Sequence, residues 1–336
     1  MNKRKVSSLY IHIPFCTHLC DYCDFTKMFY LRKYVNPYLN LLIEQINDLG
    51  NKKFKTVYIG GGTPSTLSSK KLEKLLIAIY PHLAKKYEFT MEVNVESLSL
   101  DKLALMKQYG INRVSIGVQS FNNEILKFIN RHHNKRQVKY WINKFHQIGI
   151  DNINIDLIYG LPNQTLEQFE LDINEALNLN ISHISSYSLT INKNTVFYNK
   201  GIKEVSDDLS REFYDLLYQK LLKAGFERYE VSNFAKNKKY SKHNLTYWND
   251  DEYIGIGLGA HGYVDNVRYE NTSNMNQYLK RKYVYQKDKL IKTEQIEDYL
   301  MLNLRKKWGF NKNDFVKRFT QSFDDIFKTQ KDLLIN

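Results

Sequence analysis

Three cysteines lie in one short segment near the start of the chain, and the sequence contains no others. They read Cys16-Thr-His-Leu-Cys20-Asp-Tyr-Cys23 and follow the apolar run at residues 9–15. Cubane iron–sulfur clusters are held by cysteine thiolates, usually four of them. Three thiolates therefore predict a four-iron, four-sulfur (4Fe-4S) cluster in which one iron is left free to bind another ligand.

Two other roles for these cysteines are disulfide bonding and zinc binding. A disulfide framework does not suit three cysteines, because one thiol always lacks a partner. A zinc site made of the three cysteines and His18 has suitable ligand types. Zinc ligands more often come in pairs from two separate loops, whereas these come from one. The zinc site remains the alternative to the cluster at this point.

Glycines and polar residues follow several β-rich runs of the sequence. Gly60, Gly61 and Gly62 come directly after residues 56–59, and glycines let a ligand approach the backbone more closely than a Cβ would allow. The run is not a phosphate-binding Walker loop, because no Gly-Lys-Ser/Thr follows it. Further polar residues lie inside or just after the next three β-rich runs: Glu92, Asn94, Gln119 and Asp156. A structural hydrogen bond explains each of them equally well when it is taken alone.

The elements that must position these residues alternate along residues 7–235. Short β-rich runs precede amphipathic stretches, which predicts an α/β fold with a parallel sheet. The β-rich runs are apolar on both faces, as buried parallel strands are. We expect a partial (β/α)6 barrel with its site at the carboxyl ends of the strands. The expected strands are 9–13, 56–59, 89–93, 113–117, 152–158 and 183–189, and the expected helices are 35–49, 69–82, 100–109, 135–148, 166–177 and 207–224.

The bulk composition is that of a globular protein, with 43% hydrophobic and 25% charged residues. The net charge of +13 comes from scattered lysines, and no nucleic-acid motif accompanies it, so no nucleic-acid partner is expected. The sequence has no long apolar run, so neither a membrane span nor a signal peptide is expected. Reduced cysteines and an oxygen-sensitive cluster predict a cytoplasmic protein.

The cysteine spacing resembles that of the radical S-adenosylmethionine (SAM) superfamily. Over about residues 7–265 the order of the motifs is similar to the group that contains the oxygen-independent coproporphyrinogen dehydrogenases (HemN) and the HemW haem chaperones. In this superfamily SAM chelates the open iron, and one electron from the cluster breaks a carbon–sulfur bond to release a 5′-deoxyadenosyl radical. The resemblance implies that Cys16, Cys20 and Cys23 hold the cluster. It also implies SAM contacts at Tyr10, Tyr22, Gly61, Gly62, Thr63, Glu92, Gln119, Arg131 and Asp156.

Several features distinguish the two branches of this group. The dehydrogenases carry a further cysteine where this chain has Phe25, and they have an N-terminal extension, whereas few residues precede Tyr10 here. The residues from His243 to Trp248 match the H-N-x-x-Y-W run of HemW-type proteins, which is associated with haem binding. Taken alone, this run is explained better by a structural histidine beside two core aromatic residues. With the cysteines, we expect a haem carrier and not a coproporphyrinogen oxidase, with haem contacts at His243, Asn244, Tyr247 and Trp248.

The resemblance also implies partners and a domain organisation. The cofactors are a 4Fe-4S cluster and SAM, and the cargo is haem. The partners are haem-accepting proteins, with delivery at a membrane surface and a homodimeric state as open options. We expect a core barrel at 1–235, an accessory region with the haem motif at 236–292, and a helical region at 293–336. HemW-type proteins continue into a winged-helix-like segment, and residues 317–336 end within it, so the chain is expected to be naturally short or a fragment.

Overall fold

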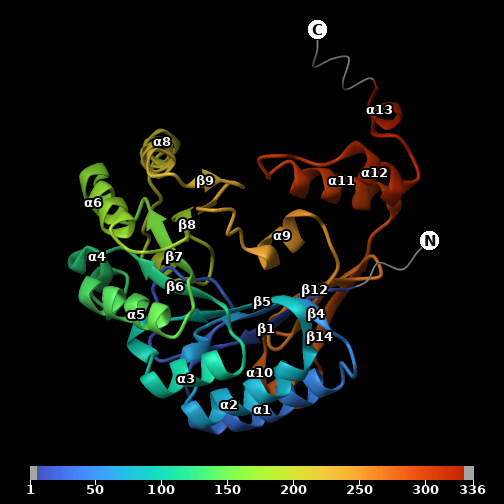
Figure 1. The fold of residues 1–336 in the computed structure, drawn as a ribbon, viewed down its shortest axis with the longest axis horizontal. Coiled ribbons are helices and arrows are strands. Elements are labelled where there is room, and N and C mark those ends of the chain that lie inside the picture. Colours follow the sequence, from blue (N-terminus) through green and yellow to red (C-terminus); the bar gives the residue numbers. More distant parts are fainter. Residues whose placement is uncertain (1–5, 329–336) are drawn as a thin grey trace.

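The computed structural model describes residues 6–328, and its centre is a single mixed sheet (Figure 1). Six parallel strands lie side by side in the order β1-β4-β5-β6-β7-β8. Their bounds are β1 Ser8–Ile13, β4 Phe54–Gly61, β5 Leu83–Val93, β6 Arg113–Gln119, β7 Asn152–Tyr159 and β8 His183–Ser188. All six predicted strands are therefore confirmed, together with the parallel α/β class.

A helix follows each of these strands, and together the helices cover the outer face of the curved sheet (Figure 1). Local sequence signals define several of the starts; for example, Asn134 and Thr165 form capping boxes with the glutamines three residues later. The six predicted helices are confirmed as α1 Arg32–Asn47, α2 Ser69–Ile79, α3 Leu100–Gln108, α5 Lys135–Gln147, α6 Leu166–Leu177 and α8 Asp207–Lys223.

The two faces of the barrel sheet differ in polarity. Residues that point toward the helices are apolar and fully buried, such as Leu9, Val57 and Ile155. Alternate residues on the same strands are polar, among them Ser115 and Asn154. The expectation that the strands are apolar on both faces is wrong for the inner face. Because side chains alternate along a strand, this inner polarity gives the barrel a hydrophilic interior.

The sheet extends at both edges beyond the barrel. β11 (Tyr253–Ile256) pairs in parallel with β1, and β12 (His261–Val264), β13 (Val267–Asn271) and β14 (Val284–Lys289) continue it in antiparallel fashion. β10 (Asn233–Ala235) and β9 (Glu227–Arg228) extend the opposite edge beyond β8. The region expected at 236–292 thus shares one sheet with the core, and the three-part division of the chain remains a prediction.

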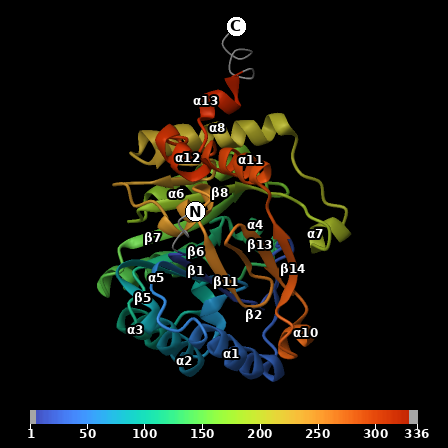
Figure 2. The ribbon, with the colours of Figure 1, turned by 90° about the vertical axis from the view of Figure 1, so that its right-hand side faces the viewer.

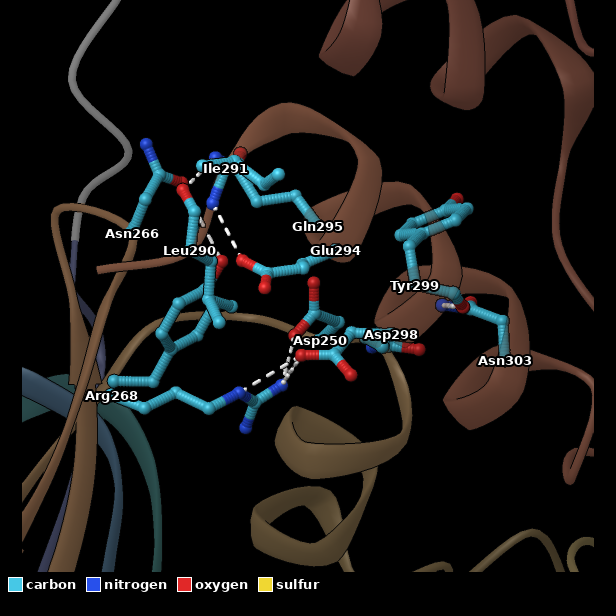
Figure 3. A network of polar contacts seen from close by, with 12 residues as sticks. Asp250, Asn266, Arg268, Leu290, Ile291, Glu294, Gln295, Asp298, Tyr299 and Asn303 are labelled. Atoms are coloured by element: carbon cyan, nitrogen blue, oxygen red, sulfur yellow. Dashed lines mark hydrogen bonds and ion pairs between the residues drawn. The ribbon is translucent and has the colours of Figure 1, made fainter. Parts of the chain in front are cut away.

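The C-terminal segment is helical, as expected. It contains α11 (Lys292–Asn303), α12 (Lys312–Phe319) and α13 (Phe323–Ile326), which lie close together (Figure 2). Their side chains share a small apolar cluster. Arg268 of β13 connects this unit to the sheet, because its guanidinium donates to Asp298 at 2.7 Å and to Asp250 at 3.3 Å (Figure 3). The last part of the predicted winged-helix-like segment, 329–336, lies outside the described residues.

The remaining elements are short. They are β2 Phe15–Cys16, β3 Met28–Phe29, α4 Asn123–Phe128, α7 Val196–Asn199, α9 Lys242–Trp248 and α10 Met275–Leu279. α9 lies on the inner side of the sheet (Figure 1), where the Glu88 carboxylate of β5 accepts hydrogen bonds from the amides of Lys242 and His243. Between residues 6 and 328, no helix is long and apolar enough to cross a membrane.

Candidate functional site

The cysteine segment leaves β1 at the carboxyl end of the barrel and is anchored from three sides. From β1, the imidazole Nε2 of His12 lies 2.7 Å from the carbonyl oxygen of Thr26. From the segment after α4, Asn130 Nδ2 donates to the carbonyl oxygen of Leu19 at 2.8 Å. From α7, the amide of Phe197 donates to the carbonyl oxygen of Asp21 at 3.0 Å. The structure thus fixes the segment in space, although it contains little secondary structure of its own.

All three cysteines line one cavity of about 330 Å³ at the mouth of the barrel. This volume is at the lower end of the range for small-molecule sites. Cys16 Sγ lies 3.5 Å from Thr63 Oγ1, and a guanidinium nitrogen of Arg131 lies 4.0 Å from Cys20 Sγ. Burial raises the pKa of the Cys16 thiol to about 11 and also raises the pKa of Cys23. Loading a cluster must therefore remove buried thiol protons.

A zinc site requires a different geometry from a 4Fe-4S cluster, because all of its ligands must contact the same ion. Among residues 6–328, no three His, Cys, Asp or Glu side chains are grouped so that they could hold a single metal ion. A cubane needs no such grouping, because its thiolates bind different irons.

The glycine run packs directly against the cysteine segment. A Cβ on Gly62 would lie 2.9 Å from Cys16 Sγ and 2.8 Å from the carbonyl carbon of Pro14. Gly61 has a φ of +114°, and a Cβ there would lie 2.5 Å from the His12 ring. Gly61 therefore requires glycine for both conformation and space, and Gly62 requires it for space. The run therefore supports the cysteine loop as well as lining the cavity.

Most residues that the resemblance assigns to SAM surround this cavity. The lining includes Tyr22, Gly61, Gly62, Thr63, Glu92, Gln119, Arg131 and Asp156. Tyr10 does not line it: its ring stacks behind Tyr58, which does, at 6.1 Å between centroids. The structure therefore brings together residues from β4, β5, β6 and β7 with residues from the cysteine segment and from the segment after α4, and their role as SAM contacts remains a prediction.

Glu92 is a half-buried residue whose carboxylate faces the cavity. Its two oxygens accept hydrogen bonds from the Tyr58 hydroxyl at 2.8 Å and from the Gly61 amide at 3.0 Å. Burial raises the pKa of Glu92 to about 7; the Tyr58 bond opposes this rise, and the nearby Asp156 adds to it. A cationic or hydroxyl-bearing ligand would therefore stabilise the ionised form of this carboxylate.

Arg131 and Asp156 bring opposite charges to the same cavity. The Arg131 guanidinium donates to Asn94 Oδ1 at 3.1 Å and lies 3.8 Å from a Glu96 oxygen. Its buried Nε has no partner among the described residues. Asp156 accepts from Asn154 Nδ2 at 2.7 Å, and burial raises its pKa. SAM carries both a carboxylate and cationic groups, so a cavity with both signs of charge suits it, and the three thiols suit a cluster.

Several residues that line the cavity were not among the sequence predictions. They are inward-pointing strand residues: Tyr58, Arg113, Ser115, Asn154, Ser185 and Tyr187. β6 and β8 each contribute two of them spaced two apart, and Asn154 of β7 lies two residues before the predicted Asp156, which is the period of a strand. A polar period-two pattern inside otherwise apolar runs is the signal that could have identified them.

The four residues predicted to contact haem do not face one common surface. The His243 ring is only 1% exposed, and its two nitrogens lie 2.9 Å from Thr56 Oγ1 and 2.8 Å from the Tyr247 hydroxyl. Burial lowers the pKa of His243 to about 3. Asn244 lines the cavity, whereas Trp248 packs under the Arg305 guanidinium. In this conformation His243 offers no free nitrogen to a haem iron, and its assignment as a haem ligand remains a prediction.

Comparison with known proteins identifies the family. The model of the radical SAM superfamily matches residues 10–176. A Lactococcus lactis protein named heme chaperone HemW is 40% identical over 99% of this chain and 90% of its own length. The chain belongs to the HemW family. The Bacillus subtilis HemW is 41% identical over 96% of the chain and 89% of its own length. This membership confirms the branch that the H-N-x-x-Y-W run and Phe25 favoured.

The fold of the HemW-family chain also matches a solved structure. The coproporphyrinogen III oxidase HemN of Escherichia coli, described as a radical SAM enzyme, superposes with a TM-score of 0.87 over 99% of this chain and 82% of its own. At 23% sequence identity this similarity establishes the shared fold. As a radical SAM family, the HemW family implies a 4Fe-4S cluster and SAM as cofactors, in agreement with the prediction from the cysteines.

Proposed function

We propose that this protein is a haem chaperone that holds a 4Fe-4S cluster on Cys16, Cys20 and Cys23, binds SAM in the adjoining cavity, and passes haem to haem-accepting proteins. The observation that carries the proposal is the convergence of three cysteines and a cavity of mixed charge at one end of the barrel. When bound, the cluster would supply an electron to SAM. Delivery at a membrane surface, a homodimeric state and a cytoplasmic location remain predictions.

The roles of the cavity residues follow from their contacts. Thr63 and Arg131 lie against the sulfurs of Cys16 and Cys20 and would orient these thiolates. Glu92, held by Tyr58 and Gly61, would accept hydrogen bonds from a ligand hydroxyl or ammonium group. Arg131 would neutralise a carboxylate that approaches the open side of the cluster.

The haem part of the proposal is supported by the family and by Phe25. The relatives with 40% and 41% identity are named heme chaperones. Phe25 lines the cavity and is 68% exposed. The dehydrogenase branch is expected to have a cysteine at this position, and phenylalanine cannot replace its thiol. An exposed ring at the cavity mouth is better suited to contact with a flat apolar ligand.

The test is an anaerobic reconstitution followed by three measurements on one preparation. We expect about four irons and four sulfides per chain, a haem absorption band on titration with haem, and transfer of that haem to an apo-haemoprotein. Stoichiometric zinc without iron would favour the zinc alternative. Conversion of coproporphyrinogen III under the same reducing conditions would instead favour the dehydrogenase, whose fold this chain shares.

A further inference from the structure

Two exposed histidines lie together at the mouth of the cavity. His18 belongs to the cysteine segment between Cys16 and Cys20, and His132 directly follows Arg131, which lines the cavity. Their ring centroids are 4.3 Å apart with an interplanar angle of 45°. His18 also lines the cavity, together with Cys20 and Phe25. Two imidazoles from distant parts of the sequence therefore meet beside the proposed cluster.

Asn130 holds the second of these imidazoles in a defined orientation. Its amide nitrogen donates to the Leu19 carbonyl oxygen, which leaves its Oδ1 as an acceptor for His132 Nε2 at 3.0 Å. The backbone of Asn130 has a positive φ of 60°, a conformation that asparagine tolerates better than most residues. His132 Nε2 is thus occupied as a donor, whereas the His18 ring, within residues 6–328, makes no hydrogen bond and contacts only His132 among rings.

Apolar side chains are exposed on the elements that frame this pair. Phe25 lies on the cavity lining, and Phe128, 41% exposed, is two residues before Asn130. Tyr198, 49% exposed, lies on α7, which is bonded to the cysteine segment through Phe197. Of these three aromatic residues, Phe25 is the one that lines the cavity. Its exposed ring offers an apolar face to a broad, flat ligand.

We propose that His18 is the axial ligand of the haem cargo, which would lie over the cavity mouth against Phe25, and that His132 is a positioning residue that packs on the His18 ring. This inference rests on the proposed function, in which the cargo is haem. The rings are close to van der Waals contact, so a porphyrin plane cannot lie between them and only one histidine can ligate. His18 is that ligand because its Nε2 is free.

The buried position of His243 points the same way. Both of its nitrogens already have partners, and haem ligation there would require α9 to leave the barrel interior. Displacing α9 would also break the hydrogen bonds that the Glu88 carboxylate accepts from the amides of Lys242 and His243. Ligation by His18 needs no such rearrangement.

The experiment is an anaerobic haem titration of cluster-loaded protein, followed through the position and intensity of the Soret band. His18→Ala should weaken haem binding about 10-fold or more and shift the band, since even the loss of an outer-shell partner of a metal ligand typically costs 10–100-fold in affinity. Added imidazole should restore the band position. His18→Met should give a third band position, because Met sulfur is an alternative haem ligand. His132→Ala should lower affinity severalfold while the band position stays unchanged.

Two controls make the outcome decisive. His146→Ala alters a histidine bonded to Asp151 and to the Asn180 carbonyl, away from the cavity, and should bind haem as the wild type does. Iron content is measured on each variant, so that cluster loss is recognised. Wild-type haem binding with an unchanged band in His18→Ala and His18→Met would overturn this inference alone. Loss of the axial-ligand spectrum only in His243→Ala would also overturn this inference and would favour His243 as the haem ligand. A wild type that binds no haem would overturn the proposed function as well.

Discussion

The Glu92 carboxyl group offers a test that joins stability to ligand binding. It belongs to a half-buried residue, it faces the cavity, and its desolvation raises its pKa from 4.5 to about 7. Replacing it with glutamine keeps the size of the side chain and removes its titration. The variant Glu92→Gln should therefore change two pH profiles: that of the free energy of unfolding and that of SAM affinity.

The sign of the stability effect follows from proton linkage. In the unfolded chain Glu92 loses its proton near pH 4.5, whereas in the folded chain it does so near pH 7. The stabilisation is fully present below pH 4.5 and is lost as the pH rises through 7. One pKa unit corresponds to 1.36 kcal/mol, so the loss is about 3 kcal/mol, an order-of-magnitude value. The unfolding free energy of Glu92→Gln should fall less over this interval, by that amount.

SAM affinity should show the opposite trend with pH. We expect SAM to bind the ionised carboxylate. One pH unit below the raised pKa, about one tenth of the protein is in this form, so the apparent dissociation constant for SAM is about 10-fold higher. Between pH 8 and pH 6, SAM should therefore bind the wild type about 10-fold more weakly. Glu92→Gln should bind SAM weakly at both values, without this slope. Equilibrium dialysis of anaerobic, cluster-loaded protein at each pH measures the SAM dissociation constant.

A matched control separates the effect of burying a carboxylate on stability from the effect of its contact with SAM. Asp172 is also buried, and burial raises its pKa to about 6, but it accepts from the Ser120 hydroxyl and the Phe121 amide and does not line the cavity. Asp172→Asn should flatten the stability profile and leave the pH slope of SAM affinity unchanged. The reasoning is refuted if Glu92→Gln keeps the wild-type slope in both profiles.

Three further predictions concern the loop, the glycines and the C-terminal helices. Replacing Cys16, Cys20 or Cys23 singly with alanine should abolish the brown iron–sulfur absorbance, while circular dichroism stays at the wild-type value; a variant that retains four irons would contradict the assignment. Gly62→Val should lower both SAM affinity and iron content, because its Cβ would meet Cys16 Sγ at 2.9 Å, whereas loss of SAM binding with full iron content would mean that the loop yields freely. Arg268→Ala removes the hydrogen bonds to Asp298 and Asp250, a loss of roughly 1.5 kcal/mol. It should speed amide exchange in α11 by about 10-fold, with cluster and haem binding unchanged. Exchange in α11 as slow as in the wild type would show that other contacts dock this helix.

The sequence by itself determined the repeated strand–helix pattern and the cysteine loop. The strand and helix signals are local, since apolar periodicity and capping residues such as Asn134 and Thr165 act within a few residues. The cysteine spacing is also local, and it indicated the cluster type before any distance was known. The family pattern then named cavity residues, most of which do line one cavity.

Only the tertiary structure decided which distant residues meet. The pairing of β11 with β1, the polar inner face with Arg113 and Asn154, and the contact of His18 with His132 all join segments far apart in the chain. His243 shows most clearly what a sequence motif cannot predict. The motif suggests an accessible haem ligand, yet the packing of α9 against β4 buries the ring beside Thr56. A motif fixes the type of side chain, whereas burial and hydrogen-bond partners, which determine its chemistry, depend on the whole fold.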